Sequence, residues 1–134
     1  MSGSSEKKPE SIRLHKRSRE LELTYPGGEH YTLSCEYLRV CSPSAETRGH
    51  GPGQEVLQTG KMNVGITAIN PVGHYALQLV FDDGHDTGLY SWDYLYALCV
   101  NREAWWQDYL ERMAAAGASR DPEVQVVRFD PHQT

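Results

Sequence analysis

The segment with the most chemically versatile side chains is an acidic turn around one histidine. His85 stands among three carboxylates, those of Asp82, Asp83 and Asp86. Imidazole and carboxylate groups hold borderline and hard cations, so this turn is a candidate metal site. A solvated turn on an acidic surface is the alternative interpretation, and the composition of the turn does not decide between the two.

Two further segments carry side chains suited to ligation or catalysis. Cys41 follows Arg39 closely, and a neighbouring guanidinium can lower the pKa of a thiol and make it reactive. His50 lies between two glycines in a long glycine-rich loop. The metal ligands that we predict are His85, Asp83 and Cys41. A metal-dependent enzyme acting on a small molecule would use His85, His50 and Cys41, whereas an inert cysteine and a solvent-facing histidine are the alternatives.

Common catalytic and metal-site motifs are missing from the chain. The sequence has no C-x-x-C pair, no phosphate-binding loop and no G-x-S-x-G nucleophile motif. None of the six histidines is followed two residues later by Asp or Glu, the usual start of a 2-His-1-carboxylate iron site. These observations favour a non-catalytic binding module over an enzyme.

Aromatic residues are concentrated near the end of the chain. Seven of the thirteen lie between Tyr90 and Tyr109. We expect Trp92 and Trp105 in the core, and we expect Trp106 and Tyr109 to be less buried. Because Trp and Tyr dominate the energetics of protein interfaces, Trp106 and Tyr109 are the predicted partner-binding residues. In the alternative, the segment 124–129 folds back and covers them.

Apolar periodicity predicts strands first and helices last. Alternation predicts a first strand over 12–17 and a hairpin over 20–34 with its turn at 26–28. Further strands are predicted from 64 to Asn70-Pro71, over 75–81 and at 89–90. A short helical turn over 35–40 and a loop over 47–60 lie between them. The sequence therefore predicts an α+β fold, a mainly antiparallel sheet with C-terminal helices packed on one face.

The two predicted helices have recognisable ends. Ser91 precedes a helix over 92–99, and Asn101 precedes a second one that Gly117 terminates. Serine and asparagine are favoured N-caps, and glycine tolerates the left-handed conformation that commonly ends a helix. Residues 1–10 are expected to be a disordered leader and residues 119–134 a loose tail.

Charge and composition restrict the function further. The chain has 134 residues, enough for one domain. Residues 1–20 carry a net charge of +3 and residues 21–134 a net charge of −8, which disfavours nucleic-acid binding. The leader lacks the apolar core of a secretory signal, no apolar run could span a membrane, and three cysteines are an odd number. We expect a cytoplasmic protein that does not bind membranes.

Two stretches, LRVCSPSAETRGHG (38–51) and GHYALQLVFDDGHDTGLYSWDYLY (73–96), resemble a bacterial family of small stand-alone proteins. That family is similar to the N-terminal domain of gamma-butyrobetaine hydroxylase and was long described only as a domain of unknown function. The resemblance covers about residues 11–118 and implies an α+β fold. A related domain is attached to a chloroplast P-loop protein that carries iron–sulfur clusters. The resemblance therefore implies an accessory module linked to iron or iron–sulfur metabolism. We expect it to bind a protein partner, and the aromatic pair Trp106 and Tyr109 also allows a second copy of the chain as that partner.

The resemblance also implies the position of a metal. In the hydroxylase, three cysteines and one histidine hold a zinc ion. The three cysteine positions read Ser42, Ser44 and Thr47 here, and the histidine position is His85. Hydroxyls are poor zinc ligands, so the three-cysteine site is expected to be lost, and zinc or iron near His85 is the candidate cofactor. The catalytic iron of the hydroxylase lies in another domain, so its oxygenase activity is not implied.

Overall fold

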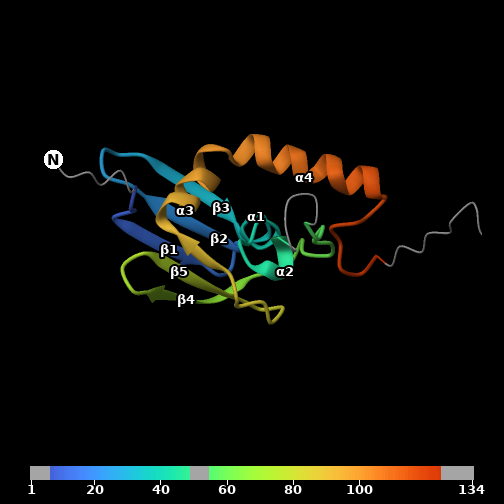
Figure 1. Cartoon of the computed structure of the whole chain (residues 1–134), viewed down its shortest axis with the longest axis horizontal. Coiled ribbons are helices and arrows are strands. Elements are labelled where there is room, and N and C mark those ends of the chain that lie inside the picture. Colours follow the sequence, from blue (N-terminus) through green and yellow to red (C-terminus); the bar gives the residue numbers. More distant parts are fainter. Residues whose placement is uncertain (1–6, 49–54, 125–134) are drawn as a thin grey trace, which may run out of the picture.

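The computed structural model describes residues 7–48 and 55–124 and has an α+β fold (Figure 1). The first sheet has the strand order β1 (Ser11–His15), β2 (Glu20–Thr24) and β3 (His30–Ser34), and the second β4 (Ile66–Val72), β5 (Ala76–Phe81) and β6 (Leu89–Ser91). All strand pairs are antiparallel. The predicted fold class is confirmed, and the strands are divided between two three-stranded sheets.

The alternating sequence of the first hairpin accounts for the core under the first sheet. In β2 the leucines are buried and the residues between them are half-buried. Leu21 pairs with Leu33 and Leu23 with Tyr31 across β2 and β3, so their side chains share one face. The turn between the strands contains Gly27 and Gly28 at positive φ, which glycine adopts without strain.

Apolar side chains of both sheets and of two helices form one continuous core. α1 (Cys35–Val40) is buried along its whole length, and the side chain of Ser34 caps it by accepting a hydrogen bond from the Tyr37 backbone N–H at 3.0 Å. α3 (Trp92–Val100) begins as predicted, with the Ser91 hydroxyl accepting from the Tyr94 N–H. The core combines Leu21, Leu23, Leu33, Leu38, Ile66, Leu79, Phe81, Leu95 and Leu98.

α4 (Arg102–Ala116) runs along one side of the molecule, next to α3 (Figure 1). Gly117 ends it in the left-handed conformation, φ 63°, as predicted. The prediction for its start is wrong in detail, because the side chain of Asn101 makes no N-cap hydrogen bond. Its amide donates instead to the carbonyl of Ala97 at 2.9 Å, so the side chain caps the end of α3.

Two other boundaries differ from the prediction. β4 continues through Asn70 and Pro71, because it is an edge strand, where a residue without an N–H is tolerated. A short helix, α2 (Ala45–Arg48), stands at the start of the predicted loop. His50 and the segment 125–129 lie outside the described residues. Among the helices of the described part of the chain, none has the length and apolar character that crossing a membrane requires.

The chain beyond α4 returns to the body of the domain. The backbone N–H groups of Gly60 and Met62 donate to the carbonyls of Ser119 and Arg120, both at 2.9 Å. The Arg120 guanidinium forms two hydrogen bonds of 2.7 Å with the buried carboxylate of Glu36 in α1. At the other end, the Lys7 ammonium pairs with Glu29 at 2.7 Å.

Candidate functional site

The turn between β5 and β6 is held in place by the carboxylate of Asp83. This group accepts hydrogen bonds from Arg39 of α1, from the Lys61 ammonium and from the backbone N–H of His85. Partial burial favours the neutral acid, but the two cations and the N–H group outweigh it and keep the pKa of Asp83 below its ordinary value. The carboxylate is thus already neutralised by two cations of the protein.

His85 is buried, with 6% of its surface exposed, although it lies in a turn between charged residues. Its Nε2 atom lies 2.8 Å from the hydroxyl oxygen of Ser42, which is fully buried. The ring also lies against Phe81, with ring centroids 6.0 Å apart. A solvated turn is therefore the wrong interpretation for His85, since this side chain connects the turn to the segment after α1.

Two further hydroxyl residues, Ser44 and Thr47, follow the Ser42 that contacts His85. Ser44 forms a hydrogen bond of 2.8 Å with Thr87, and Ser42 accepts from the Ser44 backbone N–H at 3.2 Å. Thr47 is 7% exposed, and its hydroxyl has no hydrogen-bond partner among the described residues. We call Ser42, Ser44, Thr47 and His85 the hydroxyl cluster. These are the four positions at which the resemblance implies zinc ligands. Ser42 contacts His85 directly, and the Thr47 backbone N–H donates to the Ser44 carbonyl at 3.0 Å.

The hydroxyl cluster supplies few metal ligands. Within residues 7–48 and 55–124, no group of three or more His, Cys, Asp or Glu side chains is placed to hold a metal ion. His85 contacts a neutral serine, and Asp83 is occupied by Arg39 and Lys61. The predicted ligand set of His85, Asp83 and Cys41 stays a prediction.

The Ser42–His85 pair has the hydrogen bond of a nucleophile and its base, but it is not accessible. Ser42 has no exposed surface, and a Cβ atom added at Gly88 would come within 2.4 Å of its hydroxyl oxygen. A nucleophile has to reach its substrate, so this pair is positioned to connect two segments of the fold.

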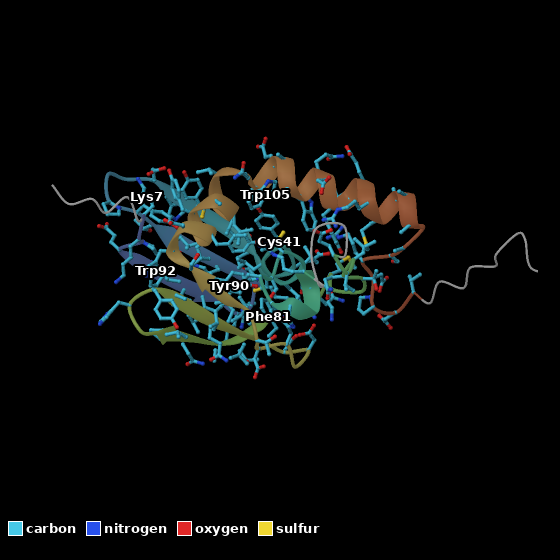
Figure 2. All side chains as sticks on the ribbon, viewed as in Figure 1. Lys7, Cys41, Phe81, Tyr90, Trp92 and Trp105 are labelled. Carbon is cyan, nitrogen blue, oxygen red and sulfur yellow. The ribbon has the colours of Figure 1, made fainter. Side chains whose placement is uncertain are left out.

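Cys41 is half-buried and lines a cleft of about 540 Å³ between α1, α2, α3 and α4. We call it the α1–α4 cleft. Figure 2 shows Cys41 close to Trp105 below α4. Burial raises the pKa of the Cys41 thiol to about 12, so it is protonated at neutral pH. Arg39 does not activate it, because its guanidinium is bound to Asp83.

Aromatic and charged side chains form most of the rest of the cleft. Tyr94 of α3 donates from its hydroxyl to the carbonyl of Cys41, and its ring carries the Arg48 guanidinium 5.0 Å from the ring centroid. Trp105 lies beside Tyr94, with ring centroids 6.3 Å apart. Arg112 and Asp108 pair at 3.0 Å on α4. The cleft volume is in the range of small-molecule and peptide-side-chain sites.

The predicted exposure of the α4 aromatics is correct for one residue and wrong for the other. Trp106 is half-buried, and the Arg120 guanidinium lies over its ring at 5.1 Å. Tyr109 is only 1% exposed, because it packs with Val40 and Met113 in a buried cluster, and its hydroxyl donates to the Gln58 carbonyl at 2.7 Å. Trp92 is in the core as predicted, whereas Trp105 is half-buried and faces the cleft.

Sequence reasoning missed the residues that shape the cleft. Arg48 and Tyr94 have no motif of their own and meet only in the fold. It also missed the ion pair of Glu36 with Arg120, which are 84 positions apart. The single available signal was Glu36 itself, a carboxylate inside an apolar helical segment, which needs a partner if it is buried.

Comparison with known proteins gives matches along the whole domain. The sequence model of a family described as gamma-butyrobetaine hydroxylase-like, N-terminal, matches residues 12–96. One protein with an NMR solution structure is 52% identical to this chain with a TM-score of 0.80, and the match covers 93% of this chain and 98% of that protein. A second NMR solution structure is 51% identical with a TM-score of 0.76, and the match covers 97% of this chain and 98% of that protein. A crystal structure of a protein from Acidithiobacillus ferrooxidans ATCC 23270 is described as a protein with unknown function of the DUF971 family. It is 38% identical to this chain with a TM-score of 0.59, and the match covers 72% of this chain and 97% of that protein. The curated proteins contain no match.

Proposed function

Since the chain belongs to the gamma-butyrobetaine hydroxylase-like N-terminal family and buries its Ser42–His85 pair, we propose that it is a non-catalytic binding module for a protein partner. The observation that carries the proposal is the α1–α4 cleft, in which aromatic rings and charged groups of α2, α3 and α4 converge beside Val40 of α1. Aromatic and arginine side chains are the ones that contribute most to binding at interfaces.

The cleft is supported by a rigid frame, as a binding site requires. Behind it, Tyr90 donates from its buried hydroxyl to the Leu38 carbonyl at 2.6 Å, and Tyr37 donates to the Leu98 carbonyl at 2.8 Å. These bonds join α1 to β6 and to α3, so the residues that line the cleft are held before any partner arrives. A preorganised site loses less conformational entropy on binding.

The alternative, a metal-dependent enzyme using His85, His50 and Cys41, has less support. The Cys41 thiol is neutral at physiological pH, and the His85 ring is turned to Ser42. His50 lies outside the described residues. No observation in the described part of the chain favours catalysis over binding.

The proposal includes the setting of the module. The free thiols of Cys35, Cys41 and Cys99 agree with a cytoplasmic location, where thiols stay reduced. The link to iron or iron–sulfur metabolism rests on the sequence resemblance, and the partner we expect is a protein of that machinery or a second copy of this chain. A metal ion at His85 belongs to the same proposal.

Affinity capture of the tagged full-length chain from its own host tests the proposal. Wild type and Trp105→Ala should be compared, with Arg13→Gln on the exposed edge of β1 as the control. We expect a partner that the wild type and the control retain and that Trp105→Ala loses. Metal analysis of the same samples, together with melting temperatures of wild type and His85→Ala in zinc, iron, manganese or nickel, tests the metal. Equal capture by a folded Trp105→Ala variant contradicts a role for the cleft.

A further inference from the structure

The α1–α4 cleft combines an apolar floor with a charged rim. Val40, Leu57 and Trp105 supply apolar surface at its base. The rim carries four charged side chains, those of Arg48, Glu55, Asp108 and Arg112. A site of this kind favours a ligand with a small apolar group close to a single charge.

One polar group of the cleft is left without a partner. The Thr47 hydroxyl is buried and has no hydrogen bond within the described residues, although most buried polar groups in proteins have one. An unpaired buried hydroxyl lowers stability, and a ligand that supplies a hydrogen-bond acceptor removes this cost when it binds. Because the hydroxyl oxygen itself has almost no accessible surface, an acceptor in the cleft reaches it only after the Thr47 side chain turns toward the cleft, and that hydrogen bond would remove the cost.

The cations of the rim indicate which acceptor it is. Arg112 is paired with Asp108, and Glu55 is likewise engaged within the protein. Arg48 follows Thr47 directly in α2, and its described contact is the ring face of Tyr94, not a carboxylate. A carboxylate can accept from the Thr47 hydroxyl and from the Arg48 guanidinium at once, and such charge-assisted bonds are the strong ones.

We propose that the α1–α4 cleft binds the C-terminal carboxylate of a partner polypeptide whose last side chain is apolar. This inference rests on the proposed function and names the chemistry by which the partner is recognised. In a C-terminal residue the carboxylate and the side chain are attached to the same Cα atom. The carboxylate can therefore meet Thr47 and Arg48 while the side chain contacts the floor beside Trp105.

The test is a titration of the full-length protein with two matched peptides, acetyl-Ala-Ala-Leu with a free carboxylate and the same peptide as its C-terminal amide. Amide chemical shifts of the cleft residues report on binding, and so does the tryptophan fluorescence, of which Trp105 is the part that lies in the cleft. The acid should bind saturably and at least about tenfold more tightly than the amide, because the amide loses the charge-assisted hydrogen bond. Binding of both peptides with equal affinity, or no saturation by the acid at 10 mM, overturns the proposal.

Variants of the two binding residues complete the test. Arg48→Gln should remove the preference for the acid, and Arg13→Gln should keep it. Valine has nearly the same shape as threonine, so Thr47→Val should leave the melting temperature equal or higher. It should weaken the affinity for the peptide acid severalfold. If Arg48→Gln and Thr47→Val both bind the acid like the wild type, these residues do not hold the carboxylate.

A third ligand distinguishes the source of the carboxylate, and one further comparison separates the two proposals. Acetyl-leucine should bind more weakly than the peptide, because it lacks the preceding residues. Equal affinity would mean that a small free acid, and not a polypeptide terminus, is the ligand. Loss of partner capture by Trp105→Ala without any peptide binding would leave the proposed function standing and remove only this inference.

Discussion

The ion pair between Glu36 and Arg120 makes a quantitative prediction about stability. The Glu36 side chain is 7% exposed, and both of its oxygens accept hydrogen bonds of 2.7 Å from the guanidinium. Arg120→Ala leaves this carboxylate buried without its counter-charge. Breaking a fully buried pair costs about 3–5 kcal/mol. Because the Arg120 side chain is 38% exposed, water can replace part of the interaction, and we expect a loss of about 2 kcal/mol.

Urea denaturation measures this loss directly, and thermal unfolding should show a melting temperature lowered by about 8 °C. Arg112→Ala is the matched control, because it breaks an arginine–carboxylate pair with Asp108 that is exposed on α4. The control should change stability by less than about 0.5 kcal/mol. Arg120→Ala should also increase quenching of the tryptophan fluorescence by acrylamide, since the guanidinium covers Trp106.

A double-mutant cycle with Glu36→Gln shows whether the stability lost in Arg120→Ala comes from its interaction with Glu36. If the effects of Arg120→Ala and Glu36→Gln are additive, or if Arg120→Ala is as stable as Arg112→Ala, the segment after α4 does not fasten α1 and the reasoning is refuted.

Three further predictions follow from the hydroxyl cluster and the first sheet. Excess chelator should leave the thermal transition unchanged, because the hydroxyls of Ser42, Ser44 and Thr47 are poor zinc ligands. Collapse of the transition would show that the fold needs a metal. The triple variant Ser42→Cys, Ser44→Cys, Thr47→Cys should gain zinc binding with His85, and a triple variant that is folded but takes up no zinc would mean that the four side chains do not converge on one point. The Glu22 carboxylate accepts hydrogen bonds from His15 and His30, and these bonds lower its pKa from 4.5 to about 2. The ionised carboxylate therefore stabilises the fold fully above pH 4.5, and this stabilisation is lost as the pH falls toward 2. Glu22→Gln should therefore lose less stability than the wild type between pH 4.5 and 2. The same fall in the free energy of unfolding for both proteins over this range, measured by urea denaturation, would contradict this.

The residues around His85 illustrate what a family resemblance adds to local pattern. The family match and the solved structures confirm the resemblance seen in residues 38–51 and 73–96. That resemblance placed Ser42, Ser44, Thr47 and His85 at corresponding positions of one site, and in the structure Ser42 contacts His85 directly. Residue types alone, from which Asp83 is predicted as a metal ligand, could not show that Arg39 and Lys61 pair with its carboxylate.

Tyr109 illustrates the opposite case, in which a correct local prediction gave a wrong exposure. Its helix and its place at the edge of the apolar stripe follow from the sequence of 102–116. Its burial depends on packing with Val40 of α1 and with Leu57, and its hydroxyl donates to the carbonyl of Gln58, 51 positions away in a segment that was predicted to be a loop. The helical period determines which side a residue faces, and it contains no information about a loop that lies over it.

The sequence by itself determined the features that depend on neighbouring residues. The hairpin of β2 and β3, the cap at Ser91 and the helix end at Gly117 come from alternation, a side-chain hydrogen bond within one turn, and a positive φ. Only the tertiary structure decided the division into two sheets, the burial of His85 and the form of the α1–α4 cleft. These depend on contacts such as Ser42 with His85, 43 positions apart, and such contacts exist only after the core has brought distant segments together.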